Sequence, residues 1–176
     1  MRILKWVLGL IAVLAVVFTA IGMILPRQVS VTRSIEIDAP VDKIFPHINS
    51  LKQMAEWSPW MGRDPAMEVS YNQVEAGEGA VMEWASEQRD VGNGRQEIVA
   101  SAVNESVTTA LDFGDMGLAQ AKLALLEADS GTTVTWTLDS DMGVGPIGRW
   151  MGLMMDRWVG GDYEQGLENL KMLVEE

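Results

Sequence analysis

The sequence predicts an α+β protein in which a curved antiparallel sheet wraps around a long C-terminal helix, preceded by one N-terminal transmembrane helix. The first observation behind this prediction is a run of 20 residues without a charge, from Trp6 to Leu25. The second is a series of short alternating segments separated by turn residues between positions 28 and 138. The third is a long helical pattern at the C-terminal end, which is needed to cover the apolar face of such a sheet.

The uncharged run is long enough to cross a membrane. A helix of this length spans about 30 Å, which is the thickness of the hydrocarbon core of a bilayer. The run has no polar face, which argues against a buried helix of a soluble domain. A cleaved signal peptide has a shorter apolar stretch of roughly 7–15 residues, and an apolar Met-Ile-Leu follows the small residues Ala20-Ile21-Gly22. We therefore expect residues 1–26 to form a retained anchor, with a cleaved signal as the alternative.

The charges around this run predict its orientation. Arg2, Lys5 and the α-amino group precede the run, whereas Arg27 and Arg33 on the other side stand beside acidic residues. Positive charge favours the cytoplasmic side of a membrane. We therefore expect a single-pass protein of the cell membrane, with residues 27–176 forming one domain outside the cytoplasm.

The elements of this domain follow from its apolar periodicity. Residues 28–37 alternate as a half-buried strand, and Asp38-Ala39-Pro40 marks the start of a short helix. A second helical piece is predicted near residues 51–55. Further strands are then indicated by alternating apolar residues, with hairpin signals such as Asn93-Gly94 between them. These segments cover residues 67–71, 82–84, 95–102, 107–113, 119–125 and 134–138.

The last segment, from Trp150 to Val174, has the spacing of an amphipathic helix. We expect this helix to lie across the concave face of the sheet, with Leu167 and Leu170 buried. The pair Gly160-Gly161 interrupts the pattern and predicts a kink.

Composition excludes several classes of function. The net charge of −12, from 13 basic and 25 acidic residues, argues against nucleic-acid binding. The chain has no cysteine and a single histidine, His47, so thiol chemistry and histidine-rich metal sites are not expected. Residues 143–148 match the GxGxxG pattern, but no strand follows to complete a dinucleotide-binding unit. We therefore expect no metal and no cofactor, and we assign no catalytic residue.

The order of elements and several short motifs resemble one known family. The motifs are residues 33–40, Trp57-Ser58-Pro59-Trp60 with Asp64-Pro65, residues 131–136, residues 160–167 and Leu170-Lys171. Through them the chain is similar to the SRPBCC, or polyketide cyclase/dehydrase, group of the START-like superfamily over residues 29–175. This resemblance implies a helix-grip fold and a hydrophobic cavity between sheet and helix that holds lipids, polyketides or other apolar molecules. It implies no catalytic residue, because the family has no universal one.

Large and soft side chains mark the predicted ligand site. Tryptophan offers a large apolar area, and methionine suits surfaces that repack around varied ligands. Ordinary core packing is the alternative explanation for each of them. The residues from which we expect ligand contacts are Trp57, Trp60, Trp84, Trp136, Met151, Met154, Met155 and Trp158.

Three functions remain open on sequence grounds. The first is a membrane-anchored domain that binds or transfers a hydrophobic small molecule or lipid. The second is a cyclase or dehydratase acting on a polyketide-like substrate. It would need an ionisable residue that faces the cavity, and the candidates are Arg33, on an otherwise apolar strand face, and an unplaced carboxylate. The third is a protein-interaction module with a filled core. A cavity of roughly 300 Å³ or more would separate the first two from the third.

Overall fold

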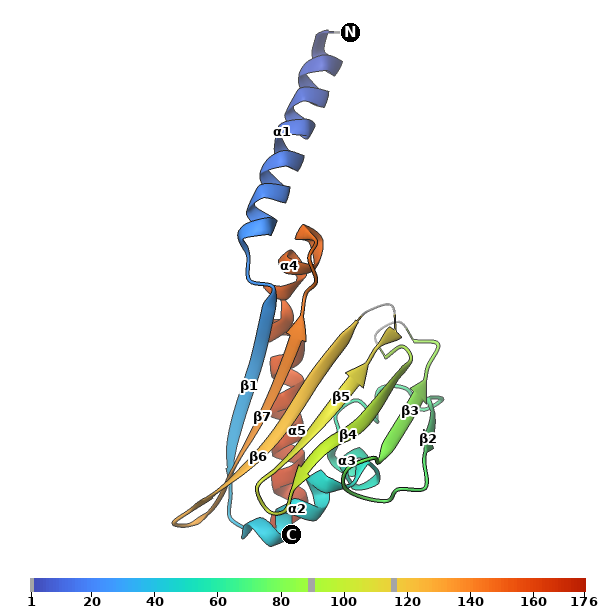
Figure 1. Ribbon diagram of the computed structural model, residues 1–176, viewed down its shortest axis with the longest axis vertical. Helices are drawn as coiled ribbons and strands as arrows, with labels where there is room; N and C mark the ends of the chain where they lie inside the picture. The colour runs from blue at the N-terminus through green and yellow to red at the C-terminus, as the bar shows by residue number, and fades with distance from the viewer. Residues whose placement is uncertain (1, 89–90, 115–116) are drawn as a thin grey trace.

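The computed structural model describes residues 2–88, 91–114 and 117–176. The chain begins with an apolar helix, continues into a strand and two short helices, and then forms six more strands and two C-terminal helices (Figure 1). The elements are α1 (Arg2–Ile24), β1 (Gln28–Ile37), α2 (Val41–Asn49), α3 (Leu51–Trp57), β2 (Glu68–Tyr71), β3 (Val81–Ala85), β4 (Gly94–Ala102), β5 (Ser106–Asp112), β6 (Leu118–Ala128), β7 (Gly131–Asp141), α4 (Pro146–Gly152) and α5 (Met155–Glu175).

The strands form one antiparallel sheet of seven strands in the order β1-β7-β6-β5-β4-β3-β2. The chain after α3 forms a meander, and β1 joins its last strand with Val31 opposite Leu138. A register shift between Ile98 and Ala100 marks a β-bulge in β4. Because bulges increase the local twist, this one helps to curve the sheet.

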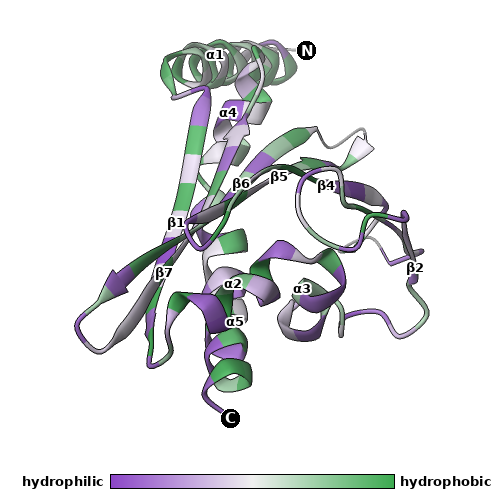
Figure 2. Cartoon of the chain, turned by 60° about the horizontal axis from the view of Figure 1, so that its bottom comes forward, coloured by the Kyte–Doolittle hydropathy of each residue, from purple (hydrophilic) through white to green (hydrophobic). Residues whose placement is uncertain are grey.

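The helices α2, α3 and α5 lie on the concave side of the sheet (Figure 2). α5 runs along β1 and β7, and its residues Leu167 and Leu170 are buried as the sequence predicts. α2 and α3 close the end of the sheet at which β1 ends and α5 terminates (Figure 1). This arrangement is the helix-grip fold, so the predicted fold class is confirmed.

The predicted interruption at Gly160-Gly161 is wrong, because α5 continues through both glycines. The interruption falls earlier, at Leu153 and Met154 between α4 and α5. The structure gives Gly160 another role, since a Cβ atom at this position would collide with the guanidinium group of Arg33. Glycine thus allows a strand side chain to lie directly against the backbone of the helix.

α1 projects from the domain, and its side chains are exposed along most of its length (Figures 1 and 2). Residues Ile3–Ile24 are long and apolar enough to cross a membrane. Three residues join this helix to β1, and they are held in place. The side chain of Arg27 forms a two-bond ion pair with Asp141 at 2.6 Å, and its carbonyl accepts a hydrogen bond from the Met142 amide at 2.8 Å.

Candidate functional site

We call the space between the concave face of the sheet and the helix α5, with the side chains that fill it, the sheet–helix layer. Its two ends are named by their distance from α1. At the proximal end, nearer α1, strands β1 and β4 begin, strands β3, β5 and β7 end, and α5 begins. The distal end carries α2, α3 and the C-terminus (Figure 1). An apolar ligand held between sheet and helix would contact one or both of these ends.

An aromatic cluster fills the middle of the layer. The ring of Trp136, on β7, stacks on that of Tyr163, on α5, at 3.8 Å between ring centroids. Trp57 and Trp60 meet Trp136 edge-on at 5.2 and 5.8 Å. Gly166 makes room for this cluster, since a Cβ atom there would press on the Trp136 ring. The cluster occupies the space beside Trp136 in which the sequence predicts ligand contacts.

The hydroxyl group of Tyr163 is neutral at physiological pH. Burial raises its pKa above the ordinary value of 10, and the charge of Asp139 acts in the same direction. A buried phenol of this kind can donate a hydrogen bond but does not serve as a general base. Tyr163 therefore contributes to packing and polarity at the centre of the layer.

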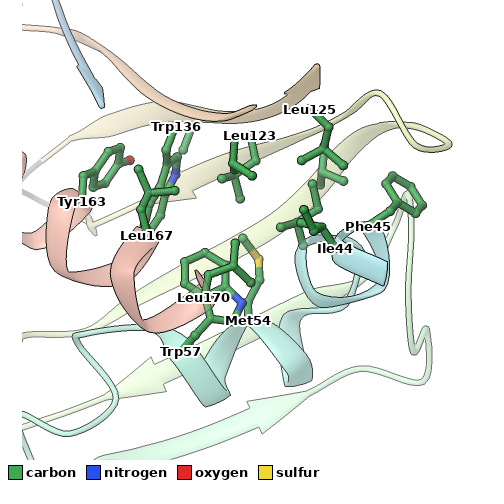
Figure 3. Close-up of a cluster of buried hydrophobic side chains, with 14 of the residues drawn as sticks. Ile44, Phe45, Met54, Trp57, Leu123, Leu125, Trp136, Tyr163, Leu167 and Leu170 are labelled. Carbon is green, nitrogen blue, oxygen red and sulfur yellow. The ribbon is translucent and has the colours of Figure 1, made fainter. Parts of the chain in front are cut away.

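The distal half of the layer is closely packed (Figure 3). Side chains from α2, α3, β6 and α5 converge there, and α2 contributes the apolar face of an amphipathic helix. The indole nitrogen of Trp57 donates a hydrogen bond to the His47 carbonyl at 3.1 Å, which joins α3 to α2. The side chains that are almost completely buried in this half include Ile44, Ile48, Leu51, Leu123, Leu167 and Leu170.

The proximal half presents apolar side chains that are only partly buried. The rings of Trp84 and Phe113 meet edge-on at 6.0 Å, and Trp84 lies over the backbone of Gly94, where a Cβ atom would collide with it. Leu111 and Ala119 are opposite each other on β5 and β6. We call this set the proximal strip, and it consists of Trp84, Leu111, Phe113, Ala119, Met155 and Val159.

The eight predicted ligand-contact residues fall into three groups. Trp57, Trp60 and Trp136 join the aromatic cluster. Trp84 and Met155 belong to the proximal strip. Met151, Met154 and Trp158 lie on the surface where α4 meets α5, with 49, 37 and 50% of each residue exposed. The eight residues thus do not surround one common space, because they belong to a buried centre, a half-buried strip and an outer surface.

Two hollows in the described part of the chain lie away from the aromatic cluster. The larger, of about 530 Å³, is an open depression at the proximal ends of the strands, lined among others by Arg95, Asp112, Asp139 and Asp141. The smaller, of about 220 Å³, lies where β1 ends, beside the turn between β6 and β7. The larger hollow is open to solvent, and its lining mixes these charged residues with apolar ones such as Leu111 and Leu118, whereas an apolar ligand site is an enclosed pocket.

Arg33 is engaged within the protein. Its guanidinium group donates to Glu164 at 2.6 Å and to Asp156 at 2.9 Å, and these carboxylates flank Gly160 on one face of α5. The two hydrogen bonds raise the pKa of Arg33, and the bond from Arg33 lowers the pKa of Asp156. Arg33 therefore clamps β1 to α5, an arrangement that spacing along the chain could not reveal.

Asp64, in the loop after α3, is a buried carboxylate that the sequence analysis did not single out for chemistry. It accepts hydrogen bonds from the hydroxyl of Ser86 and the amide of Ala66, and the Ser86 bond is the main cause of its lowered pKa. These bonds attach the loop that contains Trp60 to the end of β3. Among residues 2–88, 91–114 and 117–176, no group of three or more acidic or histidine side chains could hold a metal ion.

Comparisons with known proteins agree with this architecture. The family model for polyketide cyclase/dehydrase and lipid transport matches residues 28–175. A search of curated protein sequences found no match.

Solved structures with the same fold share little sequence with this chain. StfQ, a di-domain ARO/CYC protein from the steffimycin biosynthetic pathway, is 10% identical with a TM-score of 0.63, over 84% of this chain and 51% of that one. A protein of unknown function from Staphylococcus aureus is 10% identical with a TM-score of 0.62, over 85% and 97%. A protein from Mesorhizobium loti is 14% identical with a TM-score of 0.58, over 83% and 96%. These likenesses establish the fold.

Proposed function

The chain belongs to the polyketide cyclase/dehydrase and lipid transport family, and we propose that it is a membrane-anchored domain that binds or transfers a hydrophobic small molecule or lipid. In this proposal residues 1–26 are the anchor and residues 27–176 the binding domain. The ligand lies in the proximal half of the sheet–helix layer. The N-terminus is cytoplasmic and the domain is outside the cytoplasm, as the flanking charges indicate.

The observation that carries the proposal is the proximal strip. Its six apolar residues are partly exposed to solvent, although they lie on the same faces that are sealed at the distal end. One member of the strip is a methionine, Met155 at the start of α5, and it is partly buried. Because methionine side chains repack at low cost, they allow an apolar ligand to enter against the strip.

The predicted contact residues take distinct parts in this proposal. Trp84 and Met155 touch the ligand directly. Trp57, Trp60 and Trp136 form the inner wall at which the ligand stops. Met151, Met154 and Trp158 lie outside the layer, on the side of α1 and its membrane.

Binding or transfer fits the polar groups better than catalysis. A cyclase or dehydratase requires a group that can exchange a proton beside the substrate. Arg33 is held by Asp156 and Glu164, and burial keeps the Tyr163 hydroxyl protonated. The charged groups described near the concave face are thus committed to structural bonds.

A photoactivatable lipid tests the proposal on the full-length protein. The chain is reconstituted in nanodiscs that contain a diazirine-bearing fatty acid, irradiated and digested, and the crosslinked peptides are identified by mass spectrometry. We expect crosslinks on β3, on β5 and at Met155 or Val159. Crosslinks confined to α1 and α4 would contradict a site in the layer and would favour the protein-interaction module.

A matched pair of variants on α5 sharpens this experiment. Met155→Lys places a charge in the strip and should abolish the crosslinks there, since an unpaired charge in an apolar site is costly. Met172→Lys makes the same change at a position that is 58% exposed and should leave them unchanged.

A further inference from the structure

α4 is docked against the C-terminal turns of α1. The ring of Trp150 stacks on that of Phe18 at 5.1 Å between centroids, and its indole nitrogen donates to the Phe18 carbonyl at 3.1 Å. Gly22 faces Pro146 and Trp150 so closely that a Cβ atom would collide with both. This contact fixes the position of α4 along the axis of the apolar helix.

Arg149 closes the end of the same helix. Its guanidinium group donates to the carbonyls of Met23 at 2.5 Å and Leu25 at 3.2 Å. The last carbonyls of a helix lack partners within the helix and carry partial negative charge. Arg149 therefore caps α1, and α4 stays beside its last turns.

The position of this contact sets the depth of α4 in a membrane. Phe18 precedes Leu25, the end of the uncharged run, by seven residues, which is about 10 Å along a helix. The 20-residue run is about as long as the hydrocarbon core is thick, so it has little length to spare. A partner of Phe18 and Gly22 must therefore lie below the membrane surface, at the depth of about 5–10 Å that interfacial helices reach.

The outward surface of this segment is apolar. It is continuous with α1 through the Trp150–Phe18 contact, and Figure 1 shows α4 between α1 and the sheet. Arg157, also exposed, has a side chain long enough to reach lipid headgroups. The exposed apolar residues are Val144, Ile147, Met151, Leu153, Met154 and Trp158.

We propose that residues 144–158 insert into the bilayer interface beside α1 and hold the proximal end of the sheet against the membrane. The inference rests on the proposed anchor and adds a second membrane element to it. The partner of this surface is the lipid bilayer, because α1 brings the surface to that depth. A ligand can then pass between the bilayer and the proximal strip without crossing water.

Fluorescent labels at single cysteines test the inference, since the chain has no cysteine of its own. The full-length protein is labelled with NBD at Ile147→Cys, Leu153→Cys, Val13→Cys or Val103→Cys and placed in nanodiscs of phosphatidylcholine and phosphatidylglycerol. Val13 lies in the middle of α1, and Val103 lies in the exposed β4–β5 turn at the distal end. Each label is challenged with doxyl lipid, which quenches from within the bilayer, and with iodide, which quenches from water.

We expect doxyl lipid to quench the labels at Ile147, Leu153 and Val13, and iodide to quench the label at Val103. Iodide quenching at Ile147 and Leu153, with Val13 still quenched by lipid, would overturn the inference and leave the anchor intact. Iodide quenching at Val13 would instead show that the proposed anchor fails. Protection of Ile147 from both quenchers would also overturn the inference, because a protein surface or a second copy would then cover it.

A substitution in α1 tests whether the contact seats α4. Gly22→Leu inserts a side chain where Pro146 and Trp150 now lie, and it should convert the Ile147 label from lipid quenching to iodide quenching. Gly9→Leu is the matched control, because a Cβ atom there meets nothing within 4 Å. Equal lipid quenching at Ile147 in both variants would contradict seating by this contact.

Discussion

The distal and proximal halves of the sheet–helix layer are built from the same strands and the same helix, yet they differ in packing. In the distal half, α2 and α3 add their apolar faces, and side chains such as Leu123 and Leu170 lose nearly all their exposure. In the proximal half no such pair of helices is present among the described residues, and Trp84 and Met155 stay partly exposed. The dense packing of the distal half thus supplies most of the stability, and the proposed function assigns ligand binding to the proximal half.

The largest expected effect comes from the border between the halves. Trp136→Ala should lower the free energy of unfolding by about 3–5 kcal/mol, because it opens a hole in the aromatic cluster. Trp84→Ala should cost clearly less, since Trp84 is already partly exposed. Thermal unfolding of both variants in the same detergent measures the difference. An equal or greater loss of stability for Trp84→Ala would contradict the difference in packing between the two halves.

A pair of glycines on α5 gives the next effect. Gly166→Ala should destabilise the protein by about 1–3 kcal/mol, because the added methyl group would overpack against the Trp136 ring and Pro59. Gly161→Ala should stabilise it by about 0.5–1 kcal/mol, because nothing lies within 4 Å of the new methyl group and alanine favours the helix. If both variants unfold at the same temperature, Gly166 is not the contact point that the structure describes.

The smallest effect concerns acid. The hydrogen bond from Arg27 lowers the pKa of Asp141 to about 2, and hydrogen bonds also lower the pKa values of Asp64 and Asp156. A carboxylate with a lowered folded-state pKa stabilises the protein above its unfolded pKa, near 3.9, and this stabilisation is lost as pH falls through the folded value. All three carboxylates lie at the proximal end, so acid should loosen this end first.

Thermal midpoints measured from pH 5 to about pH 2 test this expectation. Wild-type protein should lose more stability over this window than Asp141→Asn, because the variant lacks the carboxylate that is bonded to Arg27. Asp129→Asn, in the distal turn between β6 and β7, should follow the wild type. Identical pH profiles for wild type and Asp141→Asn would show that the ion pair with Arg27 does not contribute to acid stability.

Much of the fold could be predicted because its causes are local. Alternation identified the strands, and the 3.6-residue spacing placed Leu167 and Leu170 on the buried face of the last helix. The role of Gly160 was misinterpreted because the reason for a glycine at this position is a tertiary contact. The side chain that lies against this glycine is that of Arg33, on a strand 127 positions earlier in the chain.

The site was harder to predict for the same reason. The inward phase of Trp136 is visible in the sequence, but its partners Trp57, Trp60 and Tyr163 come from other elements. Sequence spacing could not decide whether these rings would surround a space or fill it. The methionines near Trp158 were assigned to the site by residue type, whereas the structure leaves Met151 and Met154 exposed where α4 meets α5.

The short junction between α1 and β1 limits where this protein can work. A flexible linker would let a tethered domain sweep through a volume that grows with linker length. Here the junction has three residues, and Arg27 is bonded to Asp141 and to the Met142 amide. The domain can therefore move little relative to α1. With α1 in a bilayer, the domain cannot reach across to another membrane. Under the proposed function, a ligand therefore comes from the bilayer that holds α1 or is brought to the domain by a soluble carrier.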